Sequence, residues 1–208
     1  MEKVHWYKTL EKMILKYVPR RQPSYMRPNK KFVSRGIILP SICGEDKSNS
    51  IDKLALYLDS SGSMSDRDLC VLKSMLAKLS KKFPKKTEAY EFNSVLSPLK
   101  VTNGRLVEDP HGTGGTEIEV VLANMQKNKR DSGKTLSIIV TDGGFNWRSL
   151  KTFMDSHPRE KVAVVLTCDA EYYNEYICTN LGLPKSRFRI IVIDDKDVSF
   201  KGSGVQGF

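Results

Sequence analysis

The sequence lacks any apolar run long enough to cross a membrane. Its longest apolar stretches, such as residues 162–166, have the length of a strand, whereas a membrane-spanning helix needs about 20 predominantly apolar residues. The first residues, Met1 to Trp6, are not followed by the apolar segment of a secretory signal peptide. We therefore expect a cytoplasmic protein.

Cysteine and histidine are scarce, and neither occurs at the spacing of a zinc site. The chain contains no CxxC pair and no HExxH motif, which are the common sequence signatures of structural and catalytic zinc. This excludes a zinc protease. The cysteines are expected to be reduced and mostly buried; they are Cys43, Cys70, Cys168 and Cys178.

Acidic residues are nearly missing from the first 36 positions. Ten Lys and Arg stand there against Glu2 and Glu11, a local charge of +8 out of a net charge of +10. Aromatic side chains, among them Tyr25 and Phe32, lie between the basic ones. Such a segment attracts nucleic acid or an acidic protein surface, or simply forms a solvated face. RNA binding by this basic arm is therefore the alternative to the function that the glycine-rich segments described below indicate.

The N-terminal 50 residues divide into a helix and an arm. Apolar residues recur at helical spacing between residues 4 and 18, which predicts an amphipathic helix that ends before Pro19 and docks on the main domain. Residues 20–50 contain Pro23, Pro28 and Pro40 and show no clear period. We interpret them as an extended basic arm.

Strand and helix patterns alternate from residue 51 onward. Strands are predicted over residues 53–58, 87–92, 95–99, 135–140, 161–166 and 187–193, and helices over residues 66–82, 117–128, 147–155 and 171–181. This order predicts a doubly wound α/β domain over residues 51–195. Its sheet is mainly parallel with one antiparallel edge hairpin, and helices cover both faces. Residues 196–208 are predicted to be a flexible tail.

Three polar, glycine-rich segments fall at the ends of predicted strands or directly before a helix, namely residues 59–64, 111–116 and 141–144. In an open parallel sheet the carboxyl ends of the strands meet at one edge, where ligands bind. A hard cation such as Mg²⁺ prefers about six oxygen ligands near ~2.1 Å. The segments supply oxygen donors from Asp59, Ser61, Ser63, Thr116 and Asp142.

These residues resemble the metal-ion-dependent adhesion site of von Willebrand factor A (VWA) domains, which have a Rossmann-like fold. The likeness rests on Asp-x-Ser-x-Ser at residues 59–63, a threonine after Gly-Gly at Thr116, and Thr-Asp-Gly at residues 141–143. It implies that Ser61, Ser63 and Thr116 coordinate Mg²⁺ (or Mn²⁺ or Ca²⁺), with Asp59 and Asp142 acting directly or through water. One position would stay open for an Asp or Glu of a protein partner.

The arm resembles the segment before a bacterial VWA-like domain. Residues 24–32, followed by Ile-Leu-Pro at residues 38–40, are similar to that segment in predicted metallopeptidases encoded beside MoxR-type AAA+ ATPases. This chain lacks their HExxH motif. The resemblance implies a metal-ion-dependent protein-interaction module that serves as an adaptor for an AAA+ ATPase or as part of a larger assembly, of host or phage origin.

Catalysis is not expected. An aspartyl-phosphate phosphatase needs a second carboxylate where Ser61 stands, and a serine hydrolase needs Gly-x-Ser-x-Gly around Ser63, where Met64 and Ser65 follow instead. We therefore predict no catalytic residue, and the substitution Asp59→Ala is expected to abolish metal-dependent binding while leaving the fold largely intact.

Three residues near the candidate site leave alternatives open. Thr113 competes with Thr116 for the threonine position, although Thr116 directly precedes the predicted helix. Glu117 is either a ligand or, as we prefer, an acidic residue that favours the start of a helix. Trp147 is either an exposed anchor for a partner or a cap over the sheet.

Overall fold

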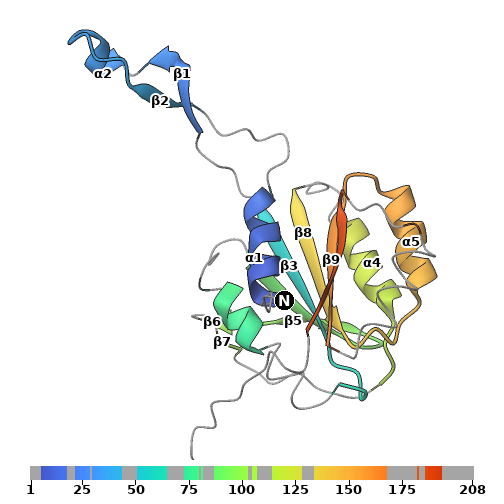
Figure 1. The fold of residues 1–208 in the computed structure, drawn as a ribbon. Helices are drawn as coiled ribbons and strands as arrows, with labels where there is room; N and C mark the ends of the chain where they lie inside the picture. Colours follow the sequence, from blue (N-terminus) through green and yellow to red (C-terminus); the bar gives the residue numbers. More distant parts are fainter. Residues whose placement is uncertain are drawn as a thin grey trace, which may run out of the picture.

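A computed structural model describes residues 6–17, 22–28, 30–43, 51–64, 73–79, 81, 87–102, 105–106, 114–127, 134–167, 182 and 186–193. Its centre is a six-stranded sheet in the order β10-β9-β8-β3-β4-β5 (Figure 1). All neighbouring strands are parallel except the edge pair β4–β5. The strands are β3 (Lys53–Asp59), β4 (Thr87–Phe92), β5 (Leu96–Leu99), β8 (Thr135–Thr141), β9 (Lys161–Leu166) and β10 (Phe188–Val192). The predicted fold class is confirmed.

The central strands are apolar on both faces because both faces are covered. Alternate residues of β3, such as Leu56 and Tyr57, enter two separate hydrophobic clusters on opposite sides of the sheet. The same alternation places Ile138 and Ile139 of β8 in different clusters. Near-continuous apolar runs of this kind are typical of parallel strands buried on both faces.

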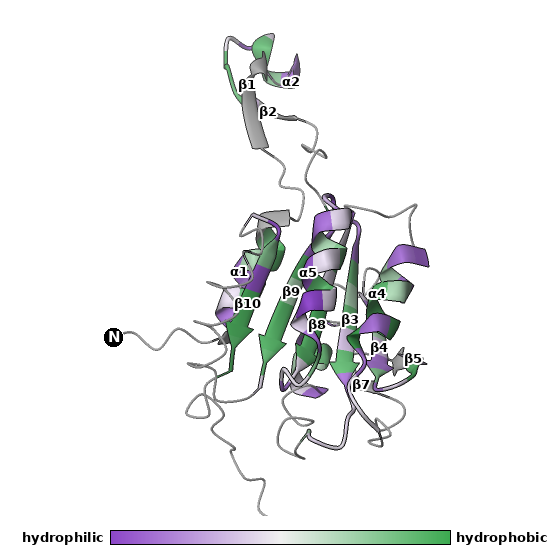
Figure 2. Ribbon diagram, turned by 90° about the vertical axis from the view of Figure 1, so that its right-hand side faces the viewer, coloured by the Kyte–Doolittle hydropathy of each residue, from purple (hydrophilic) through white to green (hydrophobic). Residues whose placement is uncertain are grey.

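Helices cover both faces of the sheet. On one face lie α1 (Trp6–Tyr17) and the helical residues 73–79, and on the other lie α4 (Ile118–Lys127) and α5 (Trp147–Ser156) (Figures 1 and 2). Leu10 and Ile14 of α1 have no exposed surface, so the predicted docking of the N-terminal helix is confirmed. None of the helices in the described ranges is long and apolar enough to cross a bilayer.

The arm is not simply extended, which corrects our interpretation of residues 20–50. The strands β1 (Gln22–Pro28) and β2 (Pro40–Cys43) pair antiparallel around α2 (Lys30–Val33). This β1–β2 hairpin lies apart from the main sheet (Figure 1). Another unpredicted hairpin joins β6 (Val101–Thr102) to β7 (Arg105–Leu106). Both hairpins use strands too short or too proline-rich to show an alternating pattern.

Several expectations fall outside the described residues. They concern the rival ligand Thr113, the end of the arm at residues 44–50, the predicted helix at residues 171–181, the tail at residues 196–208, and the burial of Cys43, Cys70, Cys168 and Cys178. The proposed boundary between residues 50 and 51 stays a prediction. The packing of α1 against the sheet means that the helix belongs to the same hydrophobic core as β3 and β8.

Candidate metal site

The candidate site lies at the end of β3, the strand on whose two sides the chain places β4 and β8. From β3 the chain runs to β4 on one side and later to β8 on the other, and ligands of open α/β sheets bind at such switch points. Leu58 of β3 pairs with Val140 of β8 in parallel register. The next residues, Asp59 and Thr141, therefore leave the sheet side by side.

The first loop, residues 59–64, begins with a buried carboxylate. Asp59 has no exposed surface, and its Oδ1 accepts a hydrogen bond of 2.9 Å from the backbone N–H of Ser61. The hydroxyl oxygens of Ser61 and Ser63 lie 3.0 Å apart. A bond of 3.1 Å from the N–H of Met64 to the carbonyl of Ser61 closes the turn. The loop thus combines two adjacent hydroxyl groups with one buried carboxylate.

The third loop, residues 141–144, is hydrogen-bonded directly to the first. The hydroxyl of Thr141 donates to Oδ2 of Asp59 at 2.6 Å and accepts from the N–H of Gly143 at 3.0 Å. Oδ1 of Asp142 accepts from the N–H of Gly144 at 2.9 Å. Gly143 has φ +93°, a conformation that glycine adopts without strain. Thr141 therefore holds the second carboxylate, Asp142, next to the first loop.

The second loop, residues 111–116, is described from Gly114 onward, and it lies against the first loop and the end of β4. The N–H of Gly62 donates to the carbonyl of Gly114 at 3.4 Å, and the N–H of Glu117 donates to the carbonyl of Asn93 at 3.1 Å. Thr116, half-buried, stands between these two contacts and two residues before α4. The side chain of Glu117 is exposed. These contacts bring the loop of Thr116 to the same edge of the sheet.

The electrostatics of this edge fit a hard cation. Burial raises the pKa of Asp59, Asp142 raises it further, and the hydrogen bonds from Thr141 and Ser61 oppose the rise. Within the described ranges, no group of three or more His, Cys, Asp and Glu side chains is arranged for a metal. Two carboxylates among hydroxyl groups would instead suit Mg²⁺, which takes few carboxylates together with neutral oxygens and water.

The structure brings together the loops of all five predicted site residues. Asp59, Ser61 and Ser63 share the first loop, and hydrogen bonds connect this loop to those of Asp142 and Thr116. Two residues that hold these loops had no role assigned from the sequence. They are Thr141, whose signal was its place before Asp-Gly, and Asn93, which stands in the turn between β4 and β5.

Trp147 braces the third loop. It is half-buried, its ring stacks on Phe145 with centroids 4.4 Å apart, and its indole N–H donates to the carbonyl of Gly143 at 3.2 Å. It also packs against the hydrophobic cluster below α4 and α5. These contacts support the interpretation of Trp147 as a cap over the sheet rather than as an exposed anchor for a partner.

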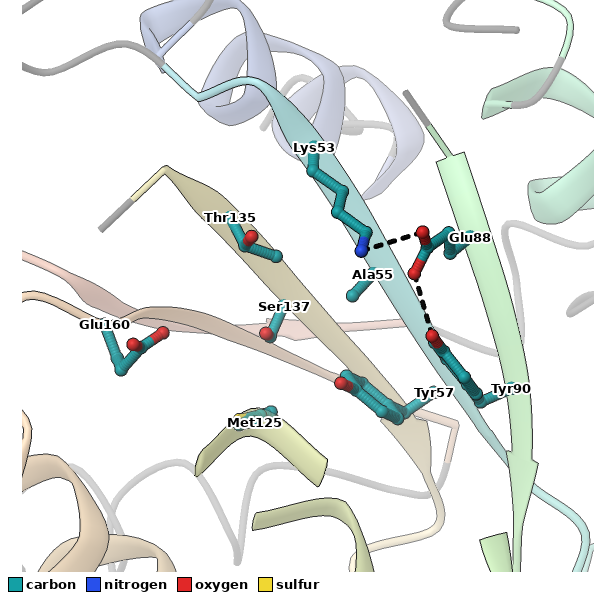
Figure 3. Close-up of a pocket in the computed structure, with 9 residues that line it drawn as sticks. All are labelled: Lys53, Ala55, Tyr57, Glu88, Tyr90, Met125, Thr135, Ser137 and Glu160. Carbon is teal, nitrogen blue, oxygen red and sulfur yellow. Dashed lines mark hydrogen bonds and ion pairs between the residues drawn. The ribbon is translucent and has the colours of Figure 1, made fainter. Parts of the chain in front are cut away.

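A polar cavity lies at the opposite, amino-terminal edge of the strands (Figure 3). It has a volume of about 10 Å³, roughly the room for one water molecule. Partial burial opposes ionisation of Glu88, but hydrogen bonds from Lys53 at 2.7 Å and Tyr90 at 2.8 Å outweigh it and lower the pKa of Glu88. Burial and the bond to Glu88 raise the pKa of Tyr90 to about 12.

The two ends of β8 allow a matched test of these hydroxyl groups. The hydroxyl oxygen of Thr135, which lines the cavity, is buried without a hydrogen-bond partner, whereas that of Thr141 makes two hydrogen bonds. We expect Thr135→Val to raise the free energy of unfolding by about 1 kcal/mol, and Thr141→Val to lower it by roughly 1–3 kcal/mol. Urea denaturation measures both. A loss of stability in Thr135→Val would instead show that its hydroxyl is hydrogen-bonded in solution, as through an ordered water.

Comparisons with known proteins support the fold. No protein-family model and no curated protein sequence matches the chain. Among solved structures, the crystal structure of the SpRpn10 VWA domain superposes with a TM-score of 0.50 at 9% sequence identity, over 69% of this chain and 88% of that domain. At this level of identity the likeness concerns the fold alone, and the chain has a VWA-like α/β fold.

Proposed function

We propose that this chain binds one divalent cation, Mg²⁺ (or Mn²⁺ or Ca²⁺), at the carboxyl edge of its sheet, and through it a carboxylate of a protein partner. The observation that carries the proposal is the buried carboxylate of Asp59. It connects the first and third loops, and the first loop also holds the adjacent hydroxyls of Ser61 and Ser63. A buried carboxylate is costly unless it is paired with positive charge, which a cation would supply.

The distance between the serine hydroxyls supports their role as ligands. Neighbouring ligands of an octahedral ion with ~2.1 Å bonds lie about 3 Å apart, and the oxygens of Ser61 and Ser63 are separated by 3.0 Å. Thr116 would supply a third hydroxyl. Asp59 and Asp142 would offset the charge, either directly or through water. The ion, when bound, supplies an electrophilic position that accepts an Asp or Glu carboxylate from outside.

The proposal describes a binding module rather than an enzyme. Its hydroxyl groups would act as neutral ligands, and its carboxylates as charge partners that also hold the loops. Specificity would come from the fit of a partner surface around the one carboxylate that reaches the metal. The similarity of the arm to segments encoded near MoxR-type ATPases makes such an ATPase the first partner to test.

Thermal unfolding with and without metal tests the cation site. A ligand at 100 times its Kd stabilises the folded state by about 2.7 kcal/mol, which corresponds to roughly 5–10 °C for a chain of this size. We expect a rise of this order on adding Mg²⁺ and its reversal by EDTA. Asp142→Asn and Ser63→Ala should each remove most of the rise.

Matched controls are available away from the site. Asp52 is an exposed carboxylate just before β3, at the opposite edge of the sheet, and Ser74 is exposed on the helix at residues 73–79. Asp52→Asn and Ser74→Ala should retain the full response to Mg²⁺. The metal proposal fails if Mg²⁺ leaves the unmodified chain unchanged, or if Asp142→Asn responds as strongly as Asp52→Asn.

A further inference from the structure

The β1–β2 hairpin exposes a group of aliphatic side chains at its tip. Val33, Ile37, Ile38 and Leu39 are 45%, 49%, 69% and 41% exposed, and the fifth large hydrophobic residue exposed in the described ranges is Val95, at 65%, on the main domain. Folded monomers rarely leave contiguous apolar patches in water, and such patches commonly mark interaction sites.

The tip has a defined backbone. The N–H groups of Arg35 and Ile37 donate to the carbonyl of Phe32 at 3.0 and 3.2 Å, and that of Gly36 donates to Val33 at 3.0 Å. Gly36 has φ +72°, where other residues are strained. Since an isolated two-stranded hairpin is marginally stable in water, a partner that covers its apolar tip would add stability.

Basic residues flank these aliphatic residues along the sequence. From Lys12 to Gly44, both included, the sequence contains eight Lys and Arg and no Asp or Glu. Lys30, Lys31 and Arg35 are exposed beside the aliphatic group. We call this surface, formed by Lys30, Lys31, Val33, Arg35, Ile37, Ile38 and Leu39, the tip surface. Its complement is a surface with apolar side chains and negative charge.

We propose that the tip surface is a second docking site, which binds an acidic segment of a partner protein that carries aliphatic or aromatic side chains. A nucleic acid would also bring negative charge, but single strands are held chiefly by stacking on aromatic rings. Among the described side chains of the hairpin, the exposed large hydrophobic ones are all aliphatic, and the aromatic ring of Phe32 is half-buried. An apolar centre with a charged rim is typical of protein–protein interfaces.

This site is independent of the cation. In Figure 2 the arrowheads of β3, β8 and β9 point away from the hairpin, so the tip surface lies on the side opposite the candidate metal edge. Binding at the tip surface should therefore persist in EDTA. It should weaken as salt increases, because screening acts on its exposed charges.

The test uses the full chain and a phage-displayed library of random 16-residue peptides, selected in EDTA at low salt. We expect the selected peptides to be rich in both Asp/Glu and Leu, Ile or Phe. Their affinity is then measured by fluorescence polarisation. The double substitution Ile38→Ser with Leu39→Ser should weaken binding at least tenfold. The control is Val95→Ser, because Val95 is an exposed aliphatic residue directly before β5, and this substitution should leave binding unchanged.

A second variant, with reversed charges, shows whether lost binding results from the tip surface itself rather than from unfolding of the hairpin. Lys30→Glu with Arg35→Glu keeps every aliphatic side chain and should weaken peptide binding at least tenfold at low salt. Lys100→Glu with Lys134→Glu makes the same change of charge at exposed positions of the main domain and should have little effect.

Four results would overturn the proposal. Selected peptides could show no acidic enrichment, or they could bind both tip variants as well as the unmodified chain. The chain could instead form a dimer in sedimentation that Ile38→Ser with Leu39→Ser abolishes, which would assign the surface to a second copy. Finally, a 20-nucleotide RNA that binds tighter than the peptides and loses affinity in the tip variants would assign it to nucleic acid.

Discussion

Replacing Asp59 by asparagine should abolish the stabilisation by Mg²⁺ while leaving the metal-free protein at least as stable as the unmodified chain. The amide is nearly the same shape as the carboxylate, so its oxygen can still accept from the N–H of Ser61. Its NH₂ group can donate to the hydroxyl of Thr141, which rotates to suit. The substitution removes a charge that is fully buried, and burying a charge without a partner is unfavourable.

The alanine variant at the same position separates structure from binding. Asp59→Ala leaves the N–H of Ser61 and the hydroxyl of Thr141 without the partner they have in the structure, and each unpaired buried donor costs about 1–3 kcal/mol. The structure therefore revises our expectation that this variant keeps the fold largely intact. We now expect lower stability in Asp59→Ala as well as loss of the response to metal.

Thermal melts of both variants, in EDTA and in Mg²⁺, measure these effects, and calorimetric titration with Mg²⁺ measures binding itself. The essential result is the asparagine variant, whose fold should be unaffected. If Asp59→Asn binds Mg²⁺ with the affinity of the unmodified chain, the buried carboxylate has a structural role and the ion lies elsewhere.

Ile14→Ala should lower the free energy of unfolding by about 2–5 kcal/mol, the usual range for large-to-small changes in a core. Ile14 lies on α1, has no exposed surface and belongs to the same hydrophobic cluster as Leu56 and Ile138 of the central strands. Since a domain is stable by only about 5–15 kcal/mol in total, this one substitution removes a large share. The N-terminal helix is thus part of the folding unit.

Urea denaturation measures the effect as a shift in midpoint at an unchanged m-value, which indicates a change in stability rather than in the unfolded state. Lys12→Ala is the matched control, because Lys12 is exposed on the same helix and such changes stay within about 0.5 kcal/mol. An Ile14 variant as stable as the Lys12 variant would mean that α1 separates readily from the sheet.

The strands of the main sheet followed from local patterns. The predicted bounds of the strands at residues 87–92 and 161–166 match the structure, and the others differ by one residue at one or both ends. The central strands β3, β8 and β9 are apolar on both sides because the sheet is covered on both faces, so their sequences are distinctive. The predicted edge hairpin places Asn93 between its two strands, but the contact of Asn93 with Glu117, 24 positions away in sequence, could not be inferred.

The N-terminal arm shows where local reading fails. Residues 22–28 contain two prolines and pair with residues 40–43 across an intervening helix. The hairpin lies apart from the main sheet (Figure 1), and no alternation of apolar and polar residues marks its strands in the sequence. Their pairing depends on backbone hydrogen bonds and on the turn at Gly36, features that composition does not reveal.

By itself, the sequence determined the order of the strands in the main sheet, the apolar character of the central strands and five candidate oxygen donors, because each depends on residue type and local spacing. Only the tertiary structure decided that Thr141 joins two loops through Asp59, that α1 completes the core, and that the tip surface stays exposed. These depend on which distant segments meet. That outcome is set by packing of the whole chain and is written in no single stretch of it.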